Sequence, residues 1–202
     1  MERRQLLKKM ALSTGYVVAT PTLMQILSSC EGNQCVNWQP LFLSEEQAYA
    51  VEKISNVIIP QGILPAASTV NTPQFVDLVL NEVVDHKTQN IFLKGAHVFS
   101  SKFKVLTDKN ILKADKQDFQ KVVEVYFNLK DEEAKQVVDL ANSNEEDIVP
   151  SDTYYLYKYL LFIRYHSLFA YTSSEALQEE VLKYNPYTFT FTPCVSGLEF
   201  DS

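Results

Sequence analysis

The sequence predicts an all-α protein: a single compact domain of about six to seven helices, with an N-terminal signal and tether and an extended C-terminal tail. Three observations support this fold class. Apolar residues recur at helical spacing in successive segments, and capping residues and prolines mark the ends of these segments. Hydrophobic residues make up 46% of the 202 residues and aromatic residues 12%, which is enough for a folded core. No internal repeat or second domain interrupts the series.

Residues 1–29 are predicted to be a twin-arginine export signal. Arg3 and Arg4 precede a Leu-Leu-Lys sequence, and a moderately hydrophobic stretch follows over residues 10–27. This stretch is too short and too polar for a membrane span of about 20 apolar residues, so it fits the hydrophobic region of a signal. The alternative is an ordinary amphipathic N-terminal helix.

The signal ends in Leu-Ser-Ser-Cys, which resembles the cleavage site of a bacterial lipoprotein. Cys30 would then be acylated, and several acyl chains at about 0.8 kcal/mol per methylene would anchor the mature protein. We therefore expect a protein of the cell envelope or periplasm, exported by the twin-arginine route and attached to the membrane through Cys30. The alternative is a plain structural thiol beyond an ordinary cleavage site.

The predicted mature chain is acidic and lies in an oxidising compartment. Without residues 1–29 it has 14 basic and 24 acidic residues, a net charge near −10. Such a chain repels nucleic acid, and no basic patch with interleaved aromatic residues reverses this. Cys35 and Cys194 are the disulfide candidates. They can pair with each other, or Cys194 can pair with a partner subunit, and the sequence leaves both open.

A tether over residues 30–43 leads into a helical domain over residues 44–202. The apolar tether residues expected to dock on this domain are Trp38, Leu41, Phe42 and Leu43. The first helix starts at Ser44, where Gln47 completes a capping box, and it ends before Pro60.

Two further helices follow a loop. Thr72-Pro73 opens the second, because proline is favoured in a first turn, and the third runs from Thr88 to about Val105. Residues 107–114 are a connector. The residues of these three helices that are expected to face the core are Ala48, Val51, Ile54, Val57, Ile58, Phe75, Val76, Val79, Leu80, Val83, Ile91, Phe92, Ala96, Phe99 and Phe103.

A helical hairpin is predicted over residues 115–128 and 131–142. Its two apolar stripes are expected to face each other, with Phe119, Val122, Val123 and Tyr126 on the first helix and Ala134, Val137, Val138 and Leu140 on the second.

The most apolar helix is expected from Thr153 to about Tyr171, after an acidic loop and a cap at Ser151. Aromatic and aliphatic residues surround most of its circumference, so it is the predicted central helix. A short helix over residues 174–184 precedes the tail, in which aromatic residues alternate with polar ones before Cys194.

The sequence shows no recognisable catalytic apparatus. Its five glycines form no phosphate-binding loop, no Cys-x-x-Cys-His haem motif occurs, and no serine stands in a nucleophile elbow. His86, His97 and His166 have no second ligand at helical spacing, so local hydrogen bonds are expected rather than a metal site. Paired glutamates are expected at helix starts or in solvated loops.

Arg164 and His166 are the candidate residues for a partner interface. They lie two positions apart on the aromatic-rich helix, where a partner surface or a buried polar network can use both. Core packing is the expected role of His166.

Four stretches, in this order and spacing, resemble the gluconate 2-dehydrogenase subunit 3 family, the small subunits of periplasmic flavin-dependent sugar and sugar-acid dehydrogenases. The stretches are RRQLLKKMALSTG, FLSEEQAYAVEKISNVIIP, TPQFVDLVLNEVV and YHSLFAYTSSEALQEEVLKYNP. After Pro60, where members of the family often carry Thr-Asp-x-Pro-Gly-Ala, this chain has Gln-Gly-Ile-Leu-Pro-Ala-Ala and lacks the aspartate.

The resemblance implies a partner rather than an active site. It implies FAD in a large dehydrogenase subunit of the glucose–methanol–choline (GMC) type, haem in a c-type cytochrome, and no catalytic residue, cofactor or metal in this chain. The leading hypothesis is a non-catalytic accessory subunit that provides the export signal, maturation and membrane tethering of the catalytic subunit. The alternatives are a subunit that contributes Arg164 or His166 to a shared active site, and a free-standing envelope lipoprotein that binds a ligand or surface.

Overall fold

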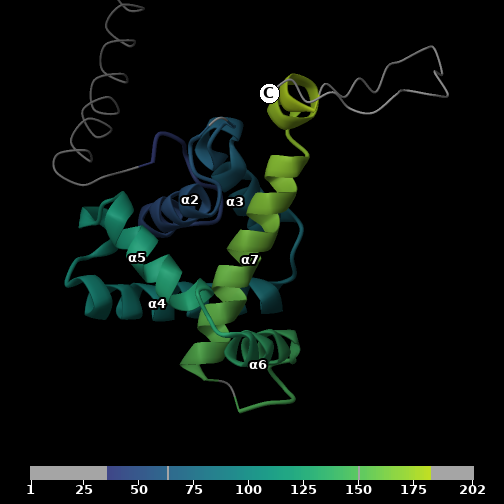
Figure 1. Ribbon diagram of the computed structural model, residues 1–202. Helices are drawn as coiled ribbons and strands as arrows, with labels where there is room; N and C mark the ends of the chain where they lie inside the picture. Colours follow the sequence, from purple (N-terminus) through teal and green to yellow (C-terminus); the bar gives the residue numbers. More distant parts are fainter. Residues whose placement is uncertain (1–35, 63, 150, 183–202) are drawn as a thin grey trace, which may run out of the picture.

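The computed structural model describes residues 36–62, 64–149 and 151–182, and all regular structure in these ranges is helical. The predicted all-α fold is therefore confirmed for the described residues. Six α-helices carry most of them (Figure 1): α2 Glu45–Ile58, α3 Thr72–Glu82, α4 His86–Thr107, α5 Lys116–Phe127, α6 Asp131–Asn142 and α7 Asp152–Thr172. Three short turns complete the series: the 3-10 helices η1 Ala67–Val70 and η2 Ile111–Lys113, and the π-helix η3 Ala176–Val181.

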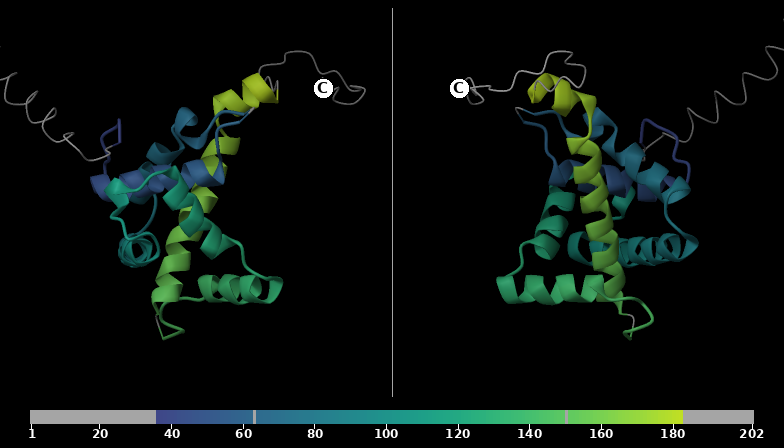
Figure 2. Two further views of the ribbon diagram at one scale, coloured as in Figure 1. Left: turned by 60° about the vertical axis from the view of Figure 1, so that its left-hand side comes forward. Right: turned by 90° about the vertical axis from the view of Figure 1, so that its right-hand side faces the viewer.

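Helix α7 is the central helix, as predicted. It contacts α2, α3, α4 and α6, with α4 crossing near its start and α2 and α3 beside its later turns (Figure 2). Gly95 lies at the crossing of α4 and α7. A Cβ atom on Gly95 would lie 2.3 Å from the carbonyl oxygen of Tyr155 and 2.6 Å from the Cβ of Tyr159. The missing side chain therefore permits the close approach of the two helices.

Capping chemistry sets the helix starts. The Ser44 hydroxyl accepts a hydrogen bond from the Gln47 backbone N–H, and the Gln47 side chain accepts one from the Ser44 N–H, so the predicted capping box is confirmed. Ser151 caps α7, also as predicted. Helix α4 starts two residues earlier than expected, because the Asp85 carboxylate accepts a hydrogen bond from the Thr88 N–H at 2.8 Å.

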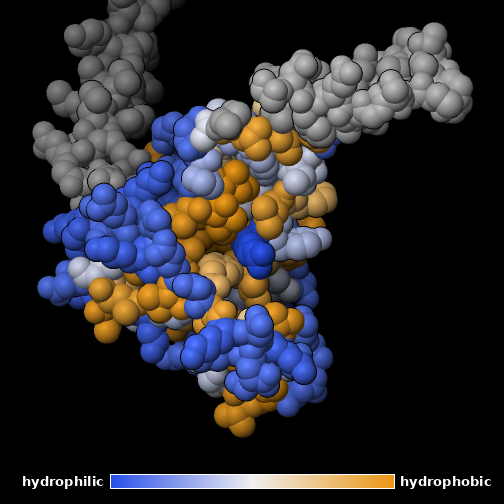
Figure 3. All heavy atoms as spheres, viewed as in Figure 1, coloured by the Kyte–Doolittle hydropathy of each residue, from blue (hydrophilic) through white to orange (hydrophobic). Residues whose placement is uncertain are grey.

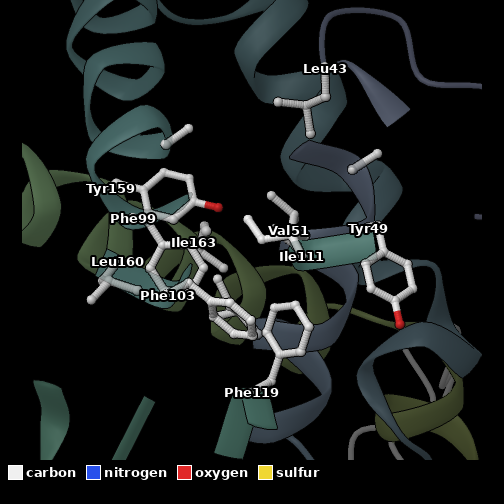
Figure 4. Packing of buried hydrophobic residues seen from close by; sticks show 14 of the residues in the cluster. Leu43, Tyr49, Val51, Phe99, Phe103, Ile111, Phe119, Tyr159, Leu160 and Ile163 are labelled. Carbon is white, nitrogen blue, oxygen red and sulfur yellow. The ribbon is translucent and has the colours of Figure 1, made fainter. Parts of the chain in front are cut away.

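Aromatic rings from α4, α5 and α7 form the centre of the core (Figure 4). The Phe103 ring centroid lies 4.7 Å from that of Phe119 and 5.7 Å from that of Phe99. Tyr159 packs on Phe99 at 5.4 Å. Burial raises the pKa of Tyr159, so its hydroxyl stays neutral. Val83, which was expected to face this core, is 73% exposed because α3 ends one residue before it.

A buried carboxylate that the sequence analysis did not predict fastens the tether to α3. Asp77 is 1% exposed and accepts hydrogen bonds from the backbone N–H groups of Leu41 at 2.6 Å, Phe42 at 3.1 Å and Leu43 at 2.9 Å. The side chains of Trp38, Phe42 and Leu43 pack on the core, as predicted. The prediction is wrong for Leu41, whose side chain is 64% exposed, because its N–H rather than its side chain makes the contact.

The predicted hairpin of α5 and α6 is wrong. Helix α5 packs on α2 and α4, and its Phe119 lies 5.9 Å from Tyr49 of α2. Tyr157 of α7 contacts the end of α5, where its hydroxyl donates to the carbonyl of Tyr126 at 3.3 Å. These neighbours use the face of α5 that was expected to meet α6. Helix α6 instead packs against α7, at the end where α7 begins (Figure 2), and its Val138 stays 49% exposed.

The short helix predicted after α7 is present in a different form. It is a π-helix over Ala176–Val181 rather than an α-helix reaching residue 184. Leu177 packs beside Ile59, which directly follows α2, and Tyr171 of α7, so η3 lies against the end of the central helix.

Candidate partner interface

The second half of α7 carries a row of apolar side chains that the described residues leave uncovered. Tyr165 is 66% exposed, Leu168 40% and Phe169 51%. Their spacing of three and four residues places them on one side of the helix. We call these three residues the α7 face. Hydrophobic residues reach the surface around the upper half of α7 in Figure 3.

Helix α3 widens this apolar surface. The Phe75 ring lies 5.9 Å from that of Phe169, and Leu78, on the next turn, is 44% exposed. An apolar groove of about 390 Å³ runs between α3 and the end of α7. We call it the α3–α7 groove, and its lining residues are Val70, Asn71, Gln74, Phe75, Leu78, Ala170, Ser173 and Ser174.

Exposed apolar surface of this kind is unfavourable in water. Burying one large apolar side chain stabilises a protein by about 1.5–3 kcal/mol. A helix that is apolar on all sides is normally buried on all sides, but α7 is enclosed only in its first half. Contiguous exposed apolar residues mark sites of interaction. The α7 face is therefore the best candidate in the described structure for binding another protein.

Arg164 and His166 do not come together. The Arg164 guanidinium lies 5.8 Å from the ring centre of Phe127, at the end of α5. The His166 ring lies 4.0 Å from that of Phe162, and its Nδ1 is 2.9 Å from the Phe162 carbonyl oxygen. Burial lowers the pKa of His166 and favours the neutral ring. Arg164 is exposed and stands one turn before Leu168, so it borders the α7 face while His166 packs on its own helix.

The acidic loop after α6 is tied to α4 and α7. Glu145 accepts hydrogen bonds from the Lys94 ammonium at 2.8 Å and from the Tyr155 hydroxyl, and the contact with Lys94 lowers the pKa of Glu145. Glu146 pairs with Lys87 at 2.6 Å. The loop was expected to be simply solvated. Lys94 and Tyr155 are 51 and 10 residues away from Glu145 in sequence, so local pattern did not reveal these contacts.

The described residues hold no group of three side chains suited to bind a metal ion. The Nδ1 atom of His86 lies 2.8 Å from the Gln89 amide oxygen. His97, Glu46 and Ser100 line a cavity of about 160 Å³ between α2 and α4. Ligand pockets usually measure about 300–1,000 Å³, so this cavity is too small to be a candidate substrate site.

The remaining residues that the sequence analysis singled out lie outside the described residues. They are Arg3, Arg4, Cys30, Cys35 and Cys194. Among the described helices, none combines the length and the apolar character that crossing a membrane requires.

Comparison with known proteins gives one match. The model of the family described as Gluconate 2-dehydrogenase subunit 3 matches residues 45–190, from the start of α2 to beyond η3. The matched part includes the α7 face and the α3–α7 groove. Comparisons with curated proteins and with solved structures gave no match.

Proposed function

Because this chain belongs to the gluconate 2-dehydrogenase subunit 3 family, and so to the subunits of such dehydrogenase complexes, we propose that it is a non-catalytic accessory subunit. Its partner would be a large flavoprotein of the GMC type that binds FAD and oxidises a sugar or gluconate. A c-type cytochrome would accept the electrons. In this proposal the chain supplies binding, export and anchoring, and the chemistry belongs to its partners.

The α7 face is the observation that carries this proposal. An accessory subunit needs a surface that gains stability when another protein covers it. The three side chains of the α7 face are large, 40% to 66% exposed, and held on a helix whose other side is buried in the core. Tyrosine is enriched among the residues that dominate binding energy, and Arg164 at the edge suits the polar rim of such an interface.

The N-terminal motifs support the proposed roles in export and anchoring. Arg3 and Arg4 match a route that transports folded proteins, which suits a partner that must load its flavin before export. Cys30, once acylated, would hold the complex at the membrane, close to its electron acceptor. The signal and the lipid on this one chain would in this way export and anchor both this chain and the flavoprotein.

Purification of the full chain from its native membrane in a mild detergent tests the proposal. We expect a large protein with flavin absorbance to copurify. The same sample on reducing and non-reducing gels will show whether Cys194 pairs with Cys35 or with the partner. Recovery of this chain without any flavoprotein would contradict the accessory role.

Two variants separate the proposed export and anchoring roles. Replacing Arg3 and Arg4 by lysine should leave both this chain and the flavoprotein in the cytoplasm. Cys30→Ser should instead release both into the soluble periplasmic fraction. If the flavoprotein reaches the periplasm normally with the lysine variant, the chain does not supply its export signal.

The exposure of Arg164 favours one alternative, in which this residue reaches a shared active site. Arg164→Ala distinguishes the two roles. If Arg164 belongs to the active site, the variant should lower turnover of the assembled complex. If Arg164 belongs to the rim of the interface, the variant should weaken assembly and leave turnover per complex unchanged. We expect the second result, and His166→Gln, which changes a side chain packed on Phe162, serves as the comparison.

A further inference from the structure

The α3–α7 groove lies close to the point where the described chain ends. Ser173 and Ser174 line the groove, and η3 follows immediately and ends at Val181. Val70, another lining residue, packs in the same small cluster as Leu177 of η3. Helix η3 alone therefore separates the groove from Leu182.

The segment that leaves this point has the pattern of an amphipathic extended strand. Tyr187, Phe189 and Phe191 alternate with three threonines at 188, 190 and 192. Alternation of this kind places all three rings on one side of an extended chain. The described residues contain no strand with which this segment could form a sheet. A groove between helices can bury its aromatic side without a sheet partner.

The intervening linker is long enough to return to the groove. Residues 183–186 span about 13–14 Å when extended. The six residues of η3 form a π-helix and cover less than the roughly 9 Å that six residues cover in an α-helix. An Asn-Pro pair at 185 and 186 is a turn sequence and favours a reversal of the chain at this position. A tether this short gives an effective concentration in the millimolar range, which favours this segment over a free partner.

The groove offers both an apolar lining and an unused hydrogen-bond acceptor. Val70, Phe75, Leu78 and Ala170 supply the apolar contacts. The side-chain oxygen of Gln74, which also lines the groove, is buried and has no hydrogen-bond partner among the described residues. A backbone N–H of an extended segment in the groove would satisfy it.

From these observations we propose that residues 187–191 fold back and occupy the α3–α7 groove of their own chain, with Tyr187, Phe189 and Phe191 facing the groove. The segment closes the groove and leaves Tyr165 and Leu168 exposed for the partner. This contact lies within one chain and does not depend on the proposed accessory role.

Site-specific photo-crosslinking of the purified full chain tests the proposal. With p-benzoylphenylalanine at position 189, irradiation should link the probe to residues 70–78 or 168–174 in the monomer band. The same probe at position 190, on the opposite side of the alternating segment, should give few such links. A crosslinked dimer would overturn the proposal in favour of a second copy. The absence of links to the groove from probes at 187, 189 and 191 would also overturn it.

Hydrogen exchange provides a second measurement that does not need the probe. Replacing Phe189 and Phe191 by threonine should speed exchange in residues 70–78 and 168–174 by at least about threefold, because the groove loses its cover. Replacing Thr188 and Thr190 by alanine is the matched control and should leave exchange unchanged. Equal exchange in both variants would contradict occupation of the groove by this segment.

Discussion

Both halves of α7 carry large apolar side chains, but their surroundings differ. From residue 154 to residue 163 no side chain is exposed, and α4 and α6 supply cover together with α5 at Tyr157. After Ile163 the helix still carries Tyr165, Leu168 and Phe169, yet this α7 face is uncovered and α3 packs on only one side of it. A contiguous apolar face thus indicates a surface that another surface can cover favourably. It does not indicate which chain buries it.

A leucine pair on the same helix provides the most direct test of this contrast. Leu160 is fully buried and Leu168 is 40% exposed. We expect Leu160→Ala to lower the free energy of unfolding by about 2–5 kcal/mol, because it leaves a cavity in the core. Leu168→Ala should cost less than about 1 kcal/mol in the isolated chain. Urea unfolding of both variants measures the difference, and equal losses would mean that the halves are equally buried.

The close crossing of α4 and α7 can be tested at Gly95. In Gly95→Ala the new methyl group overlaps the backbone of Tyr155, which should cost about 1–3 kcal/mol even though alanine favours the helix. Gly62→Ala is the control, because nothing lies within 4 Å of its added Cβ. That variant should stay within about 0.5 kcal/mol of the wild type. A Gly95→Ala protein as stable as the wild type would show that the helices do not approach this closely.

His166 lies between the buried and exposed sides of α7. The pH dependence of stability therefore reports how far the His166 ring is buried. Burial lowers its pKa below the ordinary value of about 6.5, so between the two values the unfolded chain binds the proton and the folded chain does not. The stability that the neutral ring contributes is complete above about pH 6.5 and is lost as the pH falls through that value.

The measurement compares melting temperatures at pH 7.5 and 5.5. The wild type should lose more stability than His166→Gln over this interval, by a small margin, because the ring is only partly buried. Equal losses would show that His166 titrates in the fold as it does in the unfolded chain.

Local chemistry in the sequence was sufficient to place most helices. Ser44 with Gln47, Pro73 and Ser151 each determine a helix start through one side chain or one ring, and the structure confirms all three. The central position of α7 also followed from its sequence, because a helix with apolar residues on most sides needs neighbours on most sides.

Pairings that depend on distant residues could not be predicted in this way. The apolar stripe of α5 was assigned to α6, its neighbour in sequence, but α2, α4 and α7 cover it. The anchoring of the tether by Asp77 joins residues 34 to 36 positions apart. For the interface, the sequence indicated Arg164 but did not distinguish Tyr165, Leu168 and Phe169 from the buried residues of α7, because their spacing is the same whether the cover comes from this chain or from another.

The affinity of this chain for the proposed catalytic subunit, measured with a single charged substitution on the α7 face, tests the central claim most directly. Leu168→Asp should lower the melting temperature of the isolated chain only slightly and weaken the complex by about 2 kcal/mol, roughly 30-fold in Kd, because a carboxylate buried in the interface would have no partner. Val105→Asp, at an 81% exposed position on α4, should change neither. An unchanged Kd for Leu168→Asp, with the complex intact, would show that the catalytic subunit binds elsewhere.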